Sequence, residues 1–221
     1  MSDVERPTRA HVGERRWPMA CAVLTAAVLQ VILPRRAVVP IWWLFPVVEV
    51  VLLGALIIAD PGRIDRRSTA LRRMTISLIA VMTVANTVQA LVLITDIVEG
   101  STGLTSTLLL GRGAAIWITN VIAFSLWYWV LDRGGPTERA FGTVIRPSFM
   151  FPEESSPEWT PGGWEPTYPD YLYLAFTNAA AFSPTDTLPV RVWAKMTMMA
   201  QAAISLSVAI LVVARAVNIL L

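Results

Sequence analysis

Hydrophobic residues follow one another in long runs along this chain, and short polar segments separate the runs. Four runs come first, at about 18–33, 41–59, 74–95 and 104–131. A helix needs about 20 apolar residues to cross the hydrocarbon core of a bilayer, and several runs approach or exceed that length. We therefore expect a four-helix transmembrane bundle over residues 18–131, after a polar N-terminal tail at 1–17.

The last run, at about 189–221, is the longest and predicts a fifth transmembrane helix. Composition supports the same class of fold, because 55% of the 221 residues are hydrophobic and only 15% are charged, with a mean hydropathy of +0.57. A soluble domain covers its apolar core with many more charged residues. We expect an all-α integral membrane fold with about five transmembrane helices plus a short re-entrant or interfacial helix.

Arginines gather at the ends of the apolar runs and predict an orientation. The tail carries four arginines, and the segment after the second run carries five. By the positive-inside rule, both segments face the cytoplasm. The link that begins at Asp96 has no basic residue and faces outward, so counting the runs places the next loop inside. The first run also resembles a signal peptide, but it lacks a small-residue cleavage site, so we interpret it as a retained helix.

Residues 132–169 differ in composition from the rest of the chain. Seven of the fifteen prolines lie between Asp132 and Asp170, together with two pairs of glycines. Such a segment has no apolar periodicity, and we predict an extramembrane loop without regular structure.

The region 170–221 begins with an apolar stretch that is too short to cross a bilayer. Tyr171 to Phe182 is twelve residues long, which is about 18 Å of helix. A polar break follows it: Ser183, Pro184, Thr185, Asp186 and Thr187. Irregular backbone at membrane depth is tolerated only inside protein or beside a wet cavity. The segment is therefore either a re-entrant half-helix that lines a polar path or an amphipathic helix at the interface.

The final helix has a recognisable start in the sequence. The side-chain oxygen of Asp186 or Thr187 can accept the first free amide hydrogens of a helix. Pro189 fits a first turn, where its missing amide hydrogen costs nothing. We therefore expect the helix to begin at Pro189.

The sequence from Pro169 to Leu220 resembles the C-terminal half of a bacterial multipass membrane family that is known only as a domain of unknown function. The shared features are the aromatic start "DYLYLAF", the polar Ser/Thr-Asp break, a basic residue and a long final helix. The same stretch is similar to the pore module of tetrameric potassium channels, through Asp186-Thr187-Leu188-Pro189 and Ala214-Arg215. That likeness implies a channel-like pore beside the break.

The likeness to potassium channels does not extend to the selectivity filter. A potassium filter needs glycines, whose backbone angles let successive carbonyls face one pore. This chain has no glycine after Gly163 and reads Phe182-Ser183-Pro184-Thr185 at the corresponding place. A potassium-selective filter is therefore not expected.

Several polar residues lie inside the predicted transmembrane helices, where each is costly unless it is paired or hydrated. Glu49 and Arg112 either bracket a polar cavity that the break completes or form a structural ion pair; a further alternative is that Arg112 snorkels to the interface. Asn86 and Gln89 are three residues apart and so share a helix face. That face is either a seam of hydrogen bonds between helices, as is expected for Asn120 too, or the wall of a cavity.

The candidate site residues are thus Ser183, Thr185, Asp186, Thr187, Glu49, Arg112, Asn86 and Gln89. With one cysteine, Cys21, and one histidine, His11, the chain shows no metal-ligand set and no nucleophile with a base. We expect no catalytic residues, no enzyme activity, no metal and no cofactor.

The predicted function is a channel-like or transporter-like membrane protein with a polar path at residues 171–187; the alternative is a non-catalytic membrane scaffold or accessory subunit. The expected partners are the lipid bilayer, a small ion or solute, and a second copy of the chain in a homo-oligomer. Nucleic acid is not expected, because the net charge is only +2 and the arginines lie at the ends of the apolar runs. Seventeen arginines against one lysine are common in GC-rich bacteria, so the expected location is a bacterial cell membrane.

Overall fold

A computed structural model describes residues 13–32, 43–64, 66–99, 105–142, 146–155, 158, 164–180 and 186–220. The fold is all-α. Its long elements are α1 (Trp17–Ile32), α2 (Leu44–Ala59), α3 (Thr69–Val98), α4 (Ser106–Leu131), α7 (Tyr168–Ala180) and α8 (Val192–Leu220). Its short elements are η1 (Asp132–Gly134), α5 (Pro136–Ala140), α6 (Pro152–Ser155) and the strands β1 (Glu14–Arg15), β2 (Arg63–Ile64), β3 (Phe149–Met150) and β4 (Leu188–Pro189).

Three of the described helices are long and apolar enough to cross a membrane: Thr69–Val98, Ser106–Gly134 and Val192–Val217. The apolar helices α1 and α2 contain 16 residues each, which is about 24 Å and less than the roughly 30 Å of a bilayer core. The membrane-type helical class is therefore confirmed, whereas five crossing helices stay a prediction.

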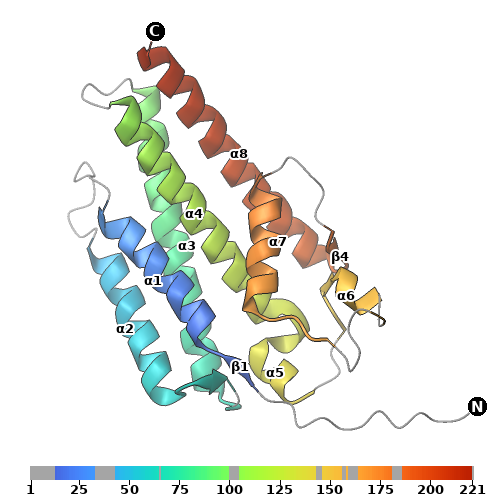
Figure 1. Cartoon of the computed structure of the whole chain (residues 1–221). Helices are drawn as coiled ribbons and strands as arrows, with labels where there is room; N and C mark the ends of the chain where they lie inside the picture. The colour runs from blue at the N-terminus through green and yellow to red at the C-terminus, as the bar shows by residue number, and fades with distance from the viewer. Residues whose placement is uncertain are drawn as a thin grey trace, which may run out of the picture.

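Helix α4 lies at the centre of the molecule. It contacts α1, α3, α7 and α8, while α2 packs on α1 and α3 (Figure 1). Helices α1 and α2 form one antiparallel hairpin and α3 and α4 a second, longer one (Figure 1). Most of α4 is buried inside the protein itself, but α3 and α8 keep a large share of their apolar residues on the outside. This distribution is typical of a bundle whose outer helices face lipid.

Local sequence signals explain where several helices begin. Ser68 and Thr105 accept hydrogen bonds from the backbone amides three residues ahead, at 3.4 and 3.2 Å, and so cap α3 and α4. At the start of α7, the carboxylate of Asp170 accepts from both the amide and the hydroxyl of Thr167, at 2.7 and 2.8 Å, and so satisfies an amide that the helix leaves free.

Basic residues and irregular segments share one end of the bundle, which we call the basic end. There β1 pairs antiparallel with β2, so that Arg15 lies opposite Arg63. The Arg67 guanidinium is 2.9 Å from the carboxylate of Glu138 in α5, and this ion pair connects the arginine-rich segment before α3 to the loop after α4. The α5 part of the loop after α4 thus lies at the same end as β1, and the side of the membrane that this end faces stays a prediction.

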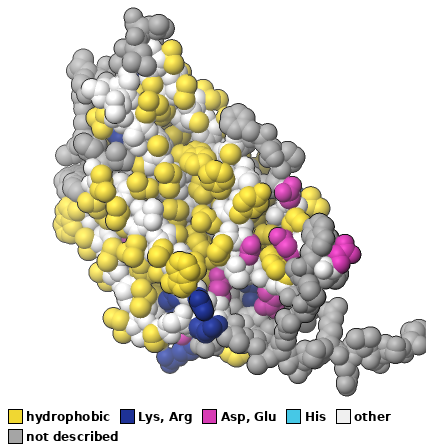
Figure 2. Space-filling model, in the orientation of Figure 1, with side chains coloured by type: hydrophobic (Ala, Val, Ile, Leu, Met, Phe, Trp, Pro, Cys, Tyr) yellow, Lys and Arg dark blue, Asp and Glu magenta, His cyan; other side chains and the backbone are white. Residues whose placement is uncertain are grey.

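The flanks of the bundle are apolar. Figure 2 shows hydrophobic side chains over the middle of one face, with Lys and Arg gathered at the basic end. The exposed large hydrophobic residues lie on several helices, including Val28 of α1, Val51 of α2, Leu91 of α3 and Ile210 of α8. A contiguous surface of this kind is typical of contact with lipid.

The loop 132–169 is more ordered than its composition predicts. It contains η1, α5, β3 and α6, so the prediction of no regular structure is wrong. The physical cause is aromatic packing: Phe149 is fully buried and its ring lies 5.1 Å from Tyr128 and 5.8 Å from Trp193. These contacts hold the loop against α4 and α8.

The start of the final helix also differs from the prediction. Pro189 lies in β4 and α8 begins at Val192, so neither Asp186 nor Thr187 caps it. Strand β4 pairs with β3, and the Val190 amide donates to the Ser148 carbonyl at 2.8 Å. These bonds hold residues 188–190 extended, because β3 offers them a partner about 40 residues away in sequence.

Close packing of α4 on α8 depends on Gly113. A Cβ atom at this position would lie 2.7 and 2.9 Å from the two methyl groups of Val212. We predict that Gly113→Ala destabilises the protein by about 1–3 kcal/mol, as overpacking does, and that adding Val212→Ala restores most of this loss. Unfolding in mixed micelles measures both changes.

Gly54→Ala in α2 is the matched control for Gly113→Ala. No described atom lies within 4 Å of a Cβ at Gly54, so only the gain in helix propensity, up to about 1 kcal/mol, acts there. Equal effects of the two substitutions would contradict the packing argument.

Candidate functional site

The chain from the start of α7 to β4 begins and ends at the basic end of the bundle. Its first residue, Tyr168, donates its amide hydrogen to Glu14 of β1 at the basic end. The helix runs along α4 and α8 for 13 residues, or about 20 Å. By Leu188 the chain is back at the basic end, paired with β3 (Figure 1). It therefore goes part of the way along the bundle and returns.

One face of α7 is buried in the bundle and the other faces outward. The buried residues are Tyr168, Tyr171, Leu174, Ala175 and Ala179. Their spacing of three, four and seven residues is that of a single helix face. Tyr173 and Phe176, on the other face, are 57% and 51% exposed. Helix α7 thus packs lengthwise as a component of the bundle.

The side chain of Gln201 in α8 forms hydrogen bonds with both α7 and α4. It is fully buried. Its Oε1 accepts from the Tyr128 hydroxyl of α4 at 2.7 Å and from the Asn178 Nδ2 of α7 at 2.8 Å. Its Nε2 donates to the Ala175 carbonyl of α7 at 2.8 Å. We call these four residues the Gln201 network, in which every polar atom of the Gln201 amide has a partner.

A second hydrogen bond joins α4 to α8, and its residue on α8 is one helical turn after Gln201. Asn120 Nδ2 donates to Ser205 Oγ at 2.9 Å, and both side chains are buried. The interhelical hydrogen bond predicted for Asn120 is confirmed. Polar residues inside α4 thus serve helix packing at two successive levels.

Two carboxylates anchor α7 at the basic end. Asp132, fully buried, accepts from the Tyr171 hydroxyl at 2.7 Å and from the Ser148 amide at 2.6 Å. It therefore joins the end of α4 to α7 and to the residue before β3.

Glu14 is the second anchor and accepts from Trp129 Nε1 at 2.8 Å and from the Tyr168 amide. Burial raises the pKa of Glu14, although these two hydrogen bonds and the nearby charge of Arg139 oppose the rise.

The polar break after α7 is described only in part. Ser183 and Thr185 lie outside the described residues. Asp186 is exposed, and Thr187 is 3% exposed beside β4. The two described residues of the break therefore lie at the basic end of the bundle, and the structure does not place Asp186 beside Glu49 or Arg112.

Glu49 and Arg112 belong to two different helix hairpins. Glu49 is fully buried and accepts from Gln30 Nε2 at 2.9 and 3.1 Å, between α1 and α2. Arg112 donates to Asp96 at 2.8 Å, between α3 and α4. Each therefore bonds the two helices of its own hairpin, so Glu49 and Arg112 neither bracket one cavity nor pair with each other. Arg112 is buried in an ion pair with Asp96, a partner that the sequence analysis did not name.

Asn86 and Gln89 lie on α3 as expected from their spacing. Asn86 is 4% exposed and Gln89 is half-buried. On the same helix, Thr83 accepts from Trp127 Nε1 of α4 at 3.0 Å. This bond joins α3 to α4 one turn before Asn86, whose buried Oδ1 has no hydrogen-bond partner among the described residues. A hydrogen-bonded seam through Asn86 and Gln89 therefore stays a prediction.

The sequence analysis did not single out Gln201, Asn178, Asp132 or Glu14. A polar residue inside an apolar run is the sequence feature that could have identified Gln201, because the same feature drew attention to Glu49.

No group of three His, Cys, Asp or Glu side chains that could hold a metal ion occurs within the part of the chain that the structure describes. No protein-family model, no curated protein and no solved structure matches the chain. The two resemblances of the C-terminal region therefore stay predictions.

Proposed function

We propose that the protein is a multipass component of the bacterial cell membrane and acts as a non-catalytic scaffold or accessory subunit. The observation that carries this proposal is the Gln201 network. Polar groups that bond to one another inside a bundle hold its helices in register. A polar path for ions or solutes instead needs side chains that face water. In the described core, the polar side chains around α7 bond to protein atoms of α4, α7 and α8.

The proposed placement has α3, α4 and α8 crossing the bilayer, with α1 and α2 as a shorter crossing hairpin and α7 as a re-entrant half-helix. The direction of α7 supports re-entrance, because the chain returns to the basic end. The arginines of that end support a cytoplasmic side. A hairpin of about 24 Å crosses where the bilayer thins or the flanking residues snorkel.

A channel-like or transporter-like function, with its path at residues 171–187, is the second candidate. The observation in its favour is that α7 stops part of the way along α8, as a half-helix beside a pore does. Asp186 and Thr187 would then lie at the mouth of the path.

Ion flux separates the two functions. In liposomes that hold the purified protein, we expect flux of common ions and small solutes to equal that of protein-free liposomes, because the described interior is packed. Asp186→Asn is then expected to change nothing. Flux above the protein-free level that Asp186→Asn reduces severalfold would favour the channel-like function instead.

The same liposomes test the placement of α7 in a Cys21→Ser background, since Cys21 is exposed. Cysteines at Glu165 and Leu188, before and after the half-helix, are expected to react with an impermeant maleimide from the same side. Glu99→Cys, at the opposite end of α3, is the control and should react from the other side. Reaction of Glu165→Cys and Leu188→Cys from opposite sides would contradict re-entrance.

A further inference from the structure

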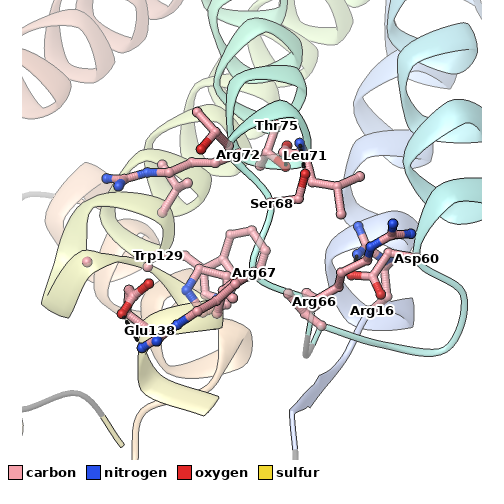
Figure 3. A pocket seen from close by; sticks show the side chains of 17 residues that line it. Arg16, Asp60, Arg66, Arg67, Ser68, Leu71, Arg72, Thr75, Trp129 and Glu138 are labelled. Atoms are coloured by element: carbon pink, nitrogen blue, oxygen red, sulfur yellow. Dashed lines mark hydrogen bonds and ion pairs between the residues drawn. The ribbon is translucent and has the colours of Figure 1, made fainter. Parts of the chain in front are cut away.

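A cavity of about 360 Å³ opens at the basic end, between the start of α3, the end of α2 and the turn from η1 into α5. We call it the arginine pocket. Its apolar wall includes Ile64 and Trp129. Its charged lining consists of Arg16, Asp60, Arg66, Arg67, Arg72 and Glu138 (Figure 3). The volume is in the range of sites for small ligands.

The charges of the pocket do not balance. Arg16 is paired with Asp60 at 2.6 Å, and both are buried. Arg67 is paired with Glu138 at 2.9 Å. Figure 3 shows the first pair on one side of the pocket and the second on the other. Among the described lining residues, four arginines and two carboxylates leave a surplus of two positive charges.

The surplus corresponds to Arg66 and Arg72, whose side chains are exposed. Arg66 donates to the Ala59 carbonyl at 3.3 Å. Neither guanidinium has a carboxylate partner within the described ranges. Figure 3 shows the Arg66 side chain on the same side as Arg16 and Asp60, and the Arg72 side chain directed to the opposite side. Arg66 is therefore the group that can meet a negative ligand beside Arg16.

Two further groups in the pocket favour an anion. The Nε–H of Arg16, which is 5% exposed, has no hydrogen-bond partner among the described residues, and a buried donor without a partner costs free energy. Ser68 and Thr69 bring the N-terminus of the 30-residue α3 to the pocket wall, where the helix dipole and free amides favour negative charge.

An exposed tryptophan beside the pocket favours a position near a membrane interface. Trp17, the residue after Arg16, is 62% exposed, and Trp129 forms part of the wall. Tryptophans gather where headgroups meet the hydrocarbon. Basic pockets at the ends of transmembrane helices are suited to anionic headgroups.

We propose that the arginine pocket binds a phosphate group, held by Arg66 together with the Nε–H of Arg16 and the N-terminus of α3. Guanidinium groups bind phosphate through short, charge-assisted hydrogen bonds. The phosphate belongs either to the headgroup of an anionic phospholipid or to a small soluble phosphate ester. This site is independent of the role of α7, because α7 does not line it.

Binding to the detergent-solubilised full-length protein tests the proposal. Phosphatidylglycerol and phosphatidylcholine are titrated and counted by native mass spectrometry, and glycerol 1-phosphate is titrated by calorimetry. We expect at least one of the two anionic phosphates to bind. Arg66→Gln should weaken it about tenfold, the loss of one charge-assisted hydrogen bond. Arg72→Gln should weaken it less, because its side chain is directed to the opposite side of the pocket. Saturation by phosphatidylglycerol alone identifies a lipid headgroup, and saturation by glycerol 1-phosphate identifies a soluble ester.

Arg73→Gln is the matched control, because Arg73 is exposed on the same turn of α3 and does not line the pocket. It should change the affinity by less than about twofold. Equal weakening by Arg73→Gln would show diffuse surface charge and overturn the proposal. Equal binding of phosphatidylcholine and phosphatidylglycerol, or no binding of either anionic phosphate, would also overturn it. Matching thermal midpoints of the three variants show that folding is intact.

Discussion

Replacing Arg112 by Leu is expected to destabilise the protein by about 3–5 kcal/mol, because the substitution leaves Asp96 as an unpaired buried carboxylate. The two side chains are each 7% exposed and lie 2.8 Å apart. They join the end of α3 to the start of α4, at the end of this hairpin that lies away from the basic end. The free energy of unfolding in mixed micelles, measured by titration with a denaturing detergent, gives the change.

The double variant Asp96→Leu/Arg112→Leu is the control for the Arg112 prediction. Removing both charges leaves no unpaired carboxylate, and replacement of a buried ion pair by apolar residues is often neutral or stabilising. The double variant should therefore be more stable than Arg112→Leu alone. A loss below about 1 kcal/mol for the single variant, or a double variant no more stable than it, would refute the structural role of the pair.

Replacing Gln201 by Leu is expected to cost about 2–3 kcal/mol and to loosen α7 selectively. The substitution removes three buried hydrogen bonds, each worth about 0.6–1 kcal/mol. Two of the three partners lie on α7, so this helix loses more contacts than α4 or α8. Hydrogen exchange of the α7 amides, followed beside the global unfolding free energy, separates the local effect from the general one.

Met199→Leu is the matched control for Gln201→Leu, because Met199 is two residues away on α8 and 64% exposed. It should leave both measurements unchanged. Ser205→Ala, which removes a single bond to Asn120, should fall between the two. Uniform acceleration of exchange in every helix of the Gln201→Leu variant would contradict the view that Gln201 specifically anchors α7.

The boundaries of the long helices followed closely from the hydrophobic pattern. The run at 104–131 corresponds to Ser106–Leu131, and the run at 74–95 lies inside Thr69–Val98. The short helix predicted from Tyr171 is Tyr168–Ala180 in the structure. These agreements have a local cause, since helix hydrogen bonds join residues four apart and the apolar runs report burial in lipid or protein.

The candidate site was predicted much less well. Glu49 and Arg112 were singled out because they are charged residues inside apolar runs. Their partners, Gln30 and Asp96, lie 19 and 16 residues away in sequence and were not predicted. Asp96 looked like part of a link and is instead the buried partner of Arg112 within α3. The spacing of a sequence shows which residues share a helix face, but it does not show which residue on another helix meets them.

The amino-acid order alone was sufficient for the class of the molecule: an all-helical chain with apolar helices of membrane-crossing length, arginines at one set of helix ends and a short apolar helix before the last long one. Those properties depend on hydropathy and helix length, which each segment carries independently of its neighbours. Three-dimensional packing was needed for the Gln201 network, the pairing of β3 with β4 and the arginine pocket. Each of these joins segments dozens of residues apart, and such contacts form only when the burial of aromatic and apolar side chains, such as Phe149, brings the segments together.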